Sequence, residues 1–386
     1  NYNVVVGDEA GTAITTGDQN VALGYGAGAA VTTGTRNTIV GALTGDAITT
    51  GANNEAFGYG ALTTNILGSR STAIGTAALL TQNPASAVDM YNVAVGYSAG
   101  ETVTTGIRNT LVGSLAGDAL TTSIDNVAIG SHALSTETTG KYSTAVGQGA
   151  LFTQNVGSDA SVYNTAVGYN TGNLITTGLK NTLMGGLAGD AITTGGSNVI
   201  IGYLSGSSGT NLTTGTGNVL LGSDADASAS DSDYANVIGY DVTGAGGYTT
   251  LGKSGDDIRA AHGTATWATV SDQRYKKDIV DSTAGLSFIN ALQPRTFKYK
   301  TLGELPETFS AYEADSTEVF KNSDTNHGFI AQEIKAAIDA DSSIADGFRL
   351  WDDREDGSQE VAEAALIPIL VKAIQELTAR IETLEG

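Results

Sequence analysis

A repeat with a fixed phase runs through most of this 386-residue chain and constrains its fold more than any other feature. The unit reads Asn-x-(Ala/Val/Ile/Leu)-(Val/Ile/Leu/Phe)-Gly, followed by small residues and often by Thr-Thr-Gly. Its leading residue recurs in steps of 17, with two longer steps of 21. A phase kept over so long a stretch indicates stacked copies of one unit rather than a disordered Gly-rich linker. The leading positions are Asn3, Asn20, Asn37, Asn54, Ser71, Asn92, Asn109, Asn126, Ser143, Asn164, Asn181 and Asn198.

Each unit holds one short apolar segment and one weaker apolar point. The segment, such as Val93-Ala94-Val95, has the length of a strand and is too short for a helix. Gly follows it, as at Gly96, where a turn with positive φ is easily made. The second apolar point, such as Val103, comes eight residues later. The repeat therefore predicts a mostly β protein, with a parallel β-solenoid shaft over residues 1–252 and two short strands per coil. We expect the aligned Asn residues to stack along the axis and to satisfy backbone groups in the turns.

The repeat unit is similar to the head repeats of trimeric autotransporter adhesins. The likeness rests on segments such as Asn92-Val93-Ala94-Val95-Gly96-Tyr97-Ser98-Ala99-Gly100. It implies a parallel β-roll that assembles as a homotrimer. The adhesin head repeats are typically shorter than 17 residues, so the shape and handedness of the coil do not carry over.

The composition changes sharply near residue 271. Of the 51 Gly residues, 45 precede it, whereas 12 of the 19 Lys and Arg residues lie from 271 onward. Such a change marks a domain boundary. We expect a linker at 253–270, a small α+β domain at 271–360 and a coiled-coil helix at 361–386. The formal net charge of −22 disfavours binding to nucleic acid or to an anionic membrane. The chain has no Cys, so disulfides and thiolate metal sites are excluded.

A set of separated motifs follows the boundary. The first is Ser271-Asp272-x-Arg274-x-Lys276-Lys277-x-Ile279, and a later one is His327-Gly328-Phe329-Ile330-Ala331-Gln332-Glu333. Their order and spacing resemble the intramolecular chaperone, or serine auto-endopeptidase, domain at the end of phage tail fibres and tailspikes. The resemblance implies a domain that trimerises, guides folding of the preceding fibre and is released by cleavage on the amino side of Ser271. The cleaved bond would be Val270–Ser271.

The residues themselves are compatible with such a reaction. A Ser hydroxyl is a weak nucleophile that needs a base, and Lys276 could act as that base if burial lowered its pKa. The two residues are five positions apart, so a bend or a neighbouring subunit must bring them together. Asp272 would support the site and His327 could assist. At most this is a single-turnover serine auto-endopeptidase that needs no cofactor or metal. The alternative is structural: Ser271 and Asp272 cap a helix and Lys276 is solvated.

The last segment carries an apolar heptad pattern. Ile residues alternate with Leu residues in steps of three and four, which is typical of positions a and d of a coiled coil. In isolation this pairing favours two strands, whereas the family resemblance implies three, and a helix folded onto its own subunit is a further alternative. The predicted seam is Ile367, Leu370, Ile374, Leu377, Ile381 and Leu384.

Two further features were weighed as binding sites. Four Asp residues between Asp224 and Asp233 lack the spacing of a calcium loop and favour a solvated loop. Tyr recurs one residue after the Gly of several units, as at Tyr25, Tyr97 and Tyr203. These rings can stack on sugars, but packing between coils explains them more simply. The repeats show no carboxylate pair of the kind that a glycosidase uses.

The sequence thus predicts a homotrimeric phage tail-fibre protein that attaches to a host surface and folds with its own C-terminal chaperone. Its expected partners are other tail proteins on the amino-terminal side and a glycan or protein of the host cell. Its expected location is the virion tail, after synthesis in the host cytoplasm. The alternative is a bacterial trimeric surface adhesin in which the C-terminal domain stays attached as a permanent trimerisation domain.

Overall fold

The chain divides into two compact units in this computed structural model, Asn1–Ser271 and Asp272–Gly386. The structure describes residues 2–264, 266–269, 271–342, 344 and 349–386. We call the first unit the shaft and the second the C-terminal unit. The boundary coincides with the change in composition.

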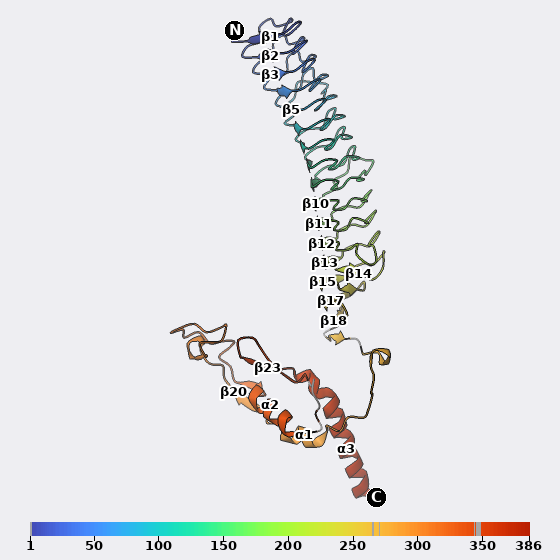
Figure 1. Ribbon diagram of the computed structural model, residues 1–386, viewed down its shortest axis with the longest axis vertical. Coiled ribbons are helices and arrows are strands. Elements are labelled where there is room, and N and C mark those ends of the chain that lie inside the picture. The colour runs from blue at the N-terminus through green and yellow to red at the C-terminus, as the bar shows by residue number, and fades with distance from the viewer. Residues whose placement is uncertain (1, 265, 270, 343, 345–348) are drawn as a thin grey trace. The chain divides into compact units, whose positions relative to one another are not determined.

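The shaft is a β-solenoid built around one long sheet (Figure 1). Each coil contributes one strand, and neighbouring coils pair in parallel one repeat apart, so that Val93 lies beside Thr110. The predicted mostly β fold is therefore confirmed. The parallel strands are β1 (Val4–Val6), β2 (Val21–Leu23), β3 (Thr38–Val40), β4 (Glu55–Phe57), β5 (Thr72–Ile74), β6 (Val93–Val95), β7 (Thr110–Val112), β8 (Val127–Ile129), β9 (Thr144–Val146), β10 (Thr165–Val167), β11 (Thr182–Met184), β12 (Val199–Ile201), β13 (Val219–Leu221), β15 (Asn236–Tyr240) and β17 (Tyr248–Lys253).

A ladder of buried Asn side chains runs through the shaft beside these strands. The Nδ2 of Asn37 donates to the carbonyl oxygen of Gly51 at 2.9 Å, and its Oδ1 accepts the backbone N–H of Asn54 at 3.0 Å. The same pair of bonds recurs in most coils, for example from Asn109 to Ser123 and Asn126. Each side chain thus satisfies one carbonyl of its own turn and one amide of the next coil, as buried backbone groups require. The predicted Asn stacking is confirmed.

Gln side chains continue the ladder at two positions where Ser replaces Asn. The side chain of Ser71 is too short to reach the next coil, and the buried Gln82 lies beside it, with 3.0 Å between Gln82 Nε2 and Ser71 Oγ. The Oε1 of Gln82 then accepts from Nδ2 of Asn92 at 2.9 Å. Gln154 does the same between Ser143 and Asn164. Both Gln residues come from the longer, 21-residue steps, so the insertions carry the missing amides.

The prediction of a second strand in every coil is wrong. The second apolar residue is buried, as at Val31 and Val103, but the backbone there forms bends. The N–H groups of Thr32 and Gly34 both donate to the carbonyl oxygen of Thr49, at 2.9 and 3.2 Å. Two amides that converge on one carbonyl cannot form the alternating pattern of a strand ladder.

Gly ends the strands because the coils approach each other too closely there for any side chain. At Gly113 the backbone has a φ of +137°, and a Cβ would lie 2.5 Å from the carbonyl oxygen of Gly130. Only Gly combines this backbone conformation with the absence of a Cβ. The end of the strand is therefore fixed by backbone packing between coils.

The shaft ends in a short antiparallel arrangement. β18 (Asp256–Ala261) folds back on β17, and β19 (Ala268–Thr269) pairs with β18. β14 (Asp226–Ala227) pairs with β16 (Thr243–Gly244) in a small separate sheet. The stretch 253–270, which the composition assigns to a linker, thus contains β18 and β19.

The C-terminal unit packs short elements around one small core. Phe288, Ile334, Leu350 and Ile369 lie at its centre. No described helix of the chain is both long and apolar enough to cross a membrane. The elements of this unit are η1 (Gln273–Tyr275), α1 (Leu286–Ala291), β20 (Arg295–Phe297), η2 (Leu302–Glu304), β21 (Asn326–Gly328), α2 (Ala331–Ala340), β22 (Trp351–Asp353), β23 (Gln359–Val361), η3 (Glu363–Leu366) and α3 (Ile367–Glu385).

Candidate cleavage site and assembly surfaces

The predicted cleavage motif begins with one turn of 3-10 helix. Asp272 caps η1, with its side chain accepting the backbone N–H of Arg274 at 2.8 Å. The Arg274 guanidinium also pairs with the Asp272 carboxylate at 2.7 Å. These hydrogen bonds lower the pKa of Asp272 and raise that of Arg274. Asp272 therefore holds Arg274 and the local turn, which is a positioning role.

Ser271 and Lys276 lie at the two ends of this turn. Both are exposed in the single chain, and Lys276 is the C-terminal cap of η1, its backbone N–H donating to Gln273 at 3.0 Å. A lysine acts as a base when it is desolvated, and the described residues of one chain leave Lys276 open to water. Val270, the other residue of the predicted cleavage bond, lies outside the described residues.

His327 lies on a different element from Ser271. It sits in β21 opposite Thr296 of β20, and its side chain is exposed. The hairpin is tied to α2 by Arg295, which donates to both carboxylate oxygens of Glu333 at 2.8 and 2.9 Å. The pair lowers the pKa of Glu333 and raises that of Arg295. The Glu333 side chain is thus engaged by Arg295 of β20.

Helix α3 presents two apolar faces. One face contributes Ile369 and Ala373 to the buried part of the C-terminal unit. The other face is the predicted heptad seam, whose members remain exposed, from 42% at Leu370 to 86% at Leu384. The side chains that pack on the protomer are therefore not those of the seam. The seam has the position and exposure expected of a surface that contacts other helices.

An acidic residue of α3 fixes the start of α1. The Oε2 of Glu376 accepts the backbone N–H of Leu286 at 3.0 Å. A side chain at Gly285 would collide with this carboxylate, since a Cβ there would lie 2.7 Å from Oε1. The sequence analysis missed this contact because the two residues are 90 positions apart and no local pattern links them.

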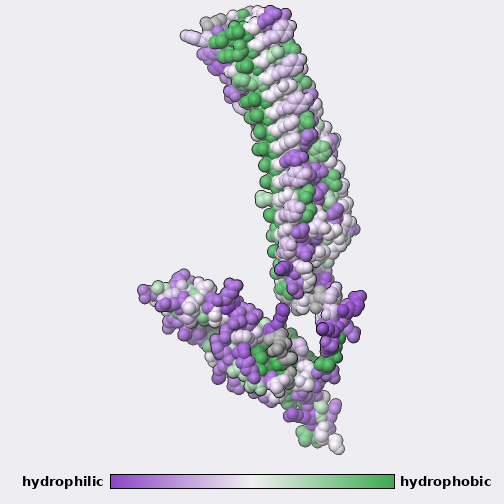
Figure 2. All heavy atoms as spheres, in the orientation of Figure 1, coloured by the Kyte–Doolittle hydropathy of each residue, from purple (hydrophilic) through white to green (hydrophobic). Residues whose placement is uncertain are grey.

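The shaft exposes a continuous apolar column along its sheet. The strands bury their middle residue and turn the third residue outwards, as in the exposed Leu23, Ile74, Ile129 and Met184. Figure 2 shows this column as a line of hydrophobic residues on the side of the shaft where Figure 1 labels the strands. The recurrent tyrosines, such as Tyr97 and Tyr203, also remain exposed. We call the column of third strand residues the apolar stripe.

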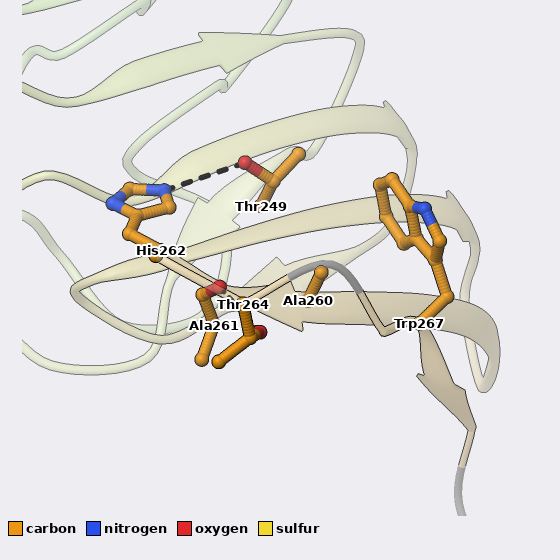
Figure 3. A pocket seen from close by; sticks show the side chains of 7 residues that line it. Thr249, Ala260, Ala261, His262, Thr264 and Trp267 are labelled. Atoms are coloured by element: carbon orange, nitrogen blue, oxygen red, sulfur yellow. Dashed lines mark hydrogen bonds between the residues drawn. The ribbon is translucent and has the colours of Figure 1, made fainter.

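A shallow hollow of about 350 Å³ lies at the end of this sheet. Figure 3 shows His262 and Trp267 beside it, with His262 Nε2 3.3 Å from Thr249 Oγ1. Thr249 and Ala260 are cross-strand partners two residues from Leu251 and Ile258, which puts all four on one face of the sheet. The hollow is therefore a part of the outward sheet face rather than a separate cleft.

The acidic segment near residue 226 differs from the solvated loop that the sequence suggested. Asp226 is buried in β14 and accepts hydrogen bonds from Oγ of Ser208 at 2.7 Å and from the N–H of Gly209. The side chain of Asp226 thus links β14 to the neighbouring coil. No group of three or more metal-binding side chains occurs among the residues that the structure describes.

Comparison with known proteins agrees with the motifs of the C-terminal unit. The family described as the chaperone of endosialidase matches residues 271–341. Comparisons with curated proteins and with solved structures gave no match. The matched segment begins at Ser271 and includes η1, α1, β20, β21 and α2. The chain thus joins a β-solenoid shaft to a C-terminal unit that is similar to the chaperone of endosialidase, an organisation like that of a tailspike.

Proposed function

We propose that this chain is a homotrimeric phage tail-fibre protein that attaches to a host surface. Its C-terminal chaperone domain would drive trimerisation and folding of the shaft, and would then release itself by cleavage between Val270 and Ser271. The observation that carries the proposal is the match of residues 271–341 to the chaperone of endosialidase, placed directly after a β-solenoid.

Two exposed apolar surfaces support assembly with further copies of the chain. The seam of α3 leaves Ile374 61% and Ile381 53% exposed, and burial of such side chains stabilises an assembly by about 1.5–3 kcal/mol each. The apolar stripe extends along the shaft, and long exposed apolar patches on soluble proteins mark interaction sites. A second and third copy would cover both surfaces with like residues.

The exposure of Lys276 agrees with a reaction that waits for assembly. The side chain of Lys276 is exposed in the single chain, whereas a lysine that activates a Ser nucleophile acts as a base when it is desolvated. A neighbouring subunit that covered the turn would desolvate Lys276 and provide the missing environment. Cleavage would then follow trimerisation, because only the trimer would contain an active site.

Intact-mass spectrometry of the wild type and of Ser271→Ala, together with light scattering, tests this function. We expect trimers in both cases, with wild type split between Val270 and Ser271 and the variant whole. Whole chains in wild-type trimers would favour the permanent trimerisation domain of a surface adhesin. A monomeric wild type would contradict the proposed assembly.

A further inference from the structure

A column of large polar and aromatic side chains runs beside the Asn ladder. Each member is the residue directly before a ladder position, so successive coils place these side chains one above another at about 4.8 Å. Five of the six are exposed and Asp125 is half-buried. The column, which we call the ladder-edge ribbon, comprises Arg70, Tyr91, Arg108, Asp125, Tyr142 and Tyr163.

The backbone of the ribbon does not call for these residue types. All six have a φ between +50° and +64°, the left-handed region that side chains other than Asn and Asp disfavour. Gly217 holds the equivalent place in a later coil with a φ of +68°. The backbone conformation therefore favours Gly at each of these positions. The presence of large side chains there needs another explanation.

The positive charges of residues 1–252 are concentrated at the same edge. Each of the five occupies the ribbon position or the residue before it, and three are paired with Asp: Arg70 with Asp89, Arg108 with Asp125, and Lys141 with Asp159, at 2.6–3.1 Å. The five are Arg36, Arg70, Arg108, Lys141 and Lys180. Pairing neutralises three of the five, while residues 1–270 as a whole carry 7 basic and 19 acidic residues, a net of −12. An acidic polymer would be repelled by the shaft, whereas an uncharged ligand would not.

The ribbon side chains are held in place by contacts with one another. The Arg108 guanidinium donates to both oxygens of Asp125, at 2.6 and 2.7 Å. Nη1 of Arg70 donates to the Tyr91 hydroxyl at 3.0 Å. The rings of Tyr142 and Tyr163 stack with centroids 5.2 Å apart and an angle of 12°. These contacts fix the side chains before any ligand arrives, which lowers the entropy cost of binding.

We propose that the ladder-edge ribbon binds a linear, uncharged polysaccharide laid along the shaft. The exposed parts of the tyrosine rings offer apolar surface to the C–H faces of sugar rings, and the Arg–Asp pairs offer donors and acceptors to neighbouring hydroxyl groups. The repeat of about 4.8 Å is close to the length of one sugar in an extended chain, so successive sugars meet successive coils. This proposal rests on the proposed host attachment and names its ligand class.

Affinity electrophoresis of the full chain tests the proposal. The gels contain dextran, pullulan or linear mixed-linkage β-glucan as uncharged probes, or polygalacturonate as an acidic one. The test variant is Tyr142→Ala/Tyr163→Ala, and Tyr142→Phe/Tyr163→Phe keeps the stacked rings. The matched control is Tyr169→Ala/Tyr203→Ala, which removes two tyrosines of similar exposure, 53% and 56%, from outside the ribbon.

We expect at least one uncharged polysaccharide to retard wild type, the Phe variant and the control, and to bind the Ala test variant at least tenfold more weakly. Equal loss in the control, unchanged binding in the test variant, retardation by polygalacturonate alone, or no retardation by any probe would each overturn the proposal. Light scattering of the same samples distinguishes a failure of the ligand proposal from a failure of the proposed fibre. A trimeric, cleaved wild type with an inert ribbon leaves the proposed fibre intact, whereas a monomeric wild type counts against the fibre itself.

Discussion

The shaft and the C-terminal unit solve the same burial problem in opposite ways. In the shaft a narrow interior repeats from coil to coil, and neutral amides such as Asn37 and Asn109 satisfy its buried backbone. In the C-terminal unit one cluster around Phe288 and Ile334 forms the whole core, and charged contacts such as Arg295–Glu333 tie the elements together at the surface. The shaft therefore depends on contacts between neighbouring coils, and the C-terminal unit on contacts distant in sequence.

The two regions also differ in what they leave uncovered. The shaft joins its coils by hydrogen bonds within one chain and exposes the apolar stripe along its sheet. Helix α3 has its last buried residue at Ala373, so its final three turns bury no side chain in the protomer. A short helix without packing is only marginally stable in water. In the proposed trimer, α3 would therefore depend on assembly more strongly than the shaft.

The largest effect is expected from charges placed in the α3 seam. Ile374→Lys/Ile381→Lys removes two apolar side chains from each copy, at about 1.5–3 kcal/mol for each side chain that assembly would bury, and sets like charges against one another. We expect trimers to give way to single chains in light scattering. Gln375→Lys/Ala379→Lys adds the same charge to exposed positions off the seam and should leave the trimer intact. A persisting trimer in the seam variant would mean that the shaft alone holds the copies together.

A smaller effect is expected from breaking the ladder inside one coil. Asn109→Ala removes an acceptor from the N–H of Asn126 and a donor from the carbonyl of Ser123. Two buried backbone groups without partners cost about 1–3 kcal/mol each, so the free energy of unfolding should fall by about 2–6 kcal/mol. Denaturant unfolding followed by circular dichroism measures it. Asn83→Ala, at an exposed asparagine, should change little, and equal losses in the two variants would show that the ladder is not stabilising.

The contrast between the repeated contacts of the shaft and the distant contacts of the C-terminal unit also explains what could be predicted from the sequence. The 17-residue phase predicts the coils and the Asn ladder because each contact repeats at one sequence distance. The heptad pattern likewise predicts a helix with an uncovered seam. The second strand of each coil was predicted wrongly, because apolar periodicity reports the burial of Val31 and not the direction of its neighbouring amides.

Contacts between residues whose sequence separation does not repeat could not be predicted from the periodicity. Gln82 completes the ladder from within an insertion, and its role follows only from its position beside Ser71 and Asn92. The contact of Glu376 with Leu286 joins residues far apart in the chain. The cleavage site around Ser271 stays a prediction. The structural alternative, a helix cap with a solvated Lys276, agrees with the Asp272 cap of η1 and the exposed Lys276, whereas the ion pair of Asp272 with Arg274 could not be predicted.

The smallest effect is expected from the surface pair of Arg108 and Asp125, which sharpens the contrast with the buried ladder. The Arg108 hydrogen bonds hold the pKa of Asp125 below its ordinary value. A lowered pKa in the folded state means that the stabilisation is fully present above the unfolded pKa of about 3.9. It is lost as the pH falls through the lower folded value. At neutral pH, Asp125→Asn should cost about 0.2–1 kcal/mol, as exposed pairs do.

Unfolding of wild type, Asp125→Asn, Arg108→Gln and the double variant, at neutral pH and below about pH 4, measures this contribution. Each single variant should lose less stability on acidification than wild type, and the double variant should match them, because either change removes the same interaction. Added salt should shrink the difference at neutral pH, since it screens exposed charges. If the pair stabilised the shaft as strongly as Asn109 does, charges on the ladder edge would be a main source of its stability. The ladder-edge ribbon would then need no ligand to account for its side chains.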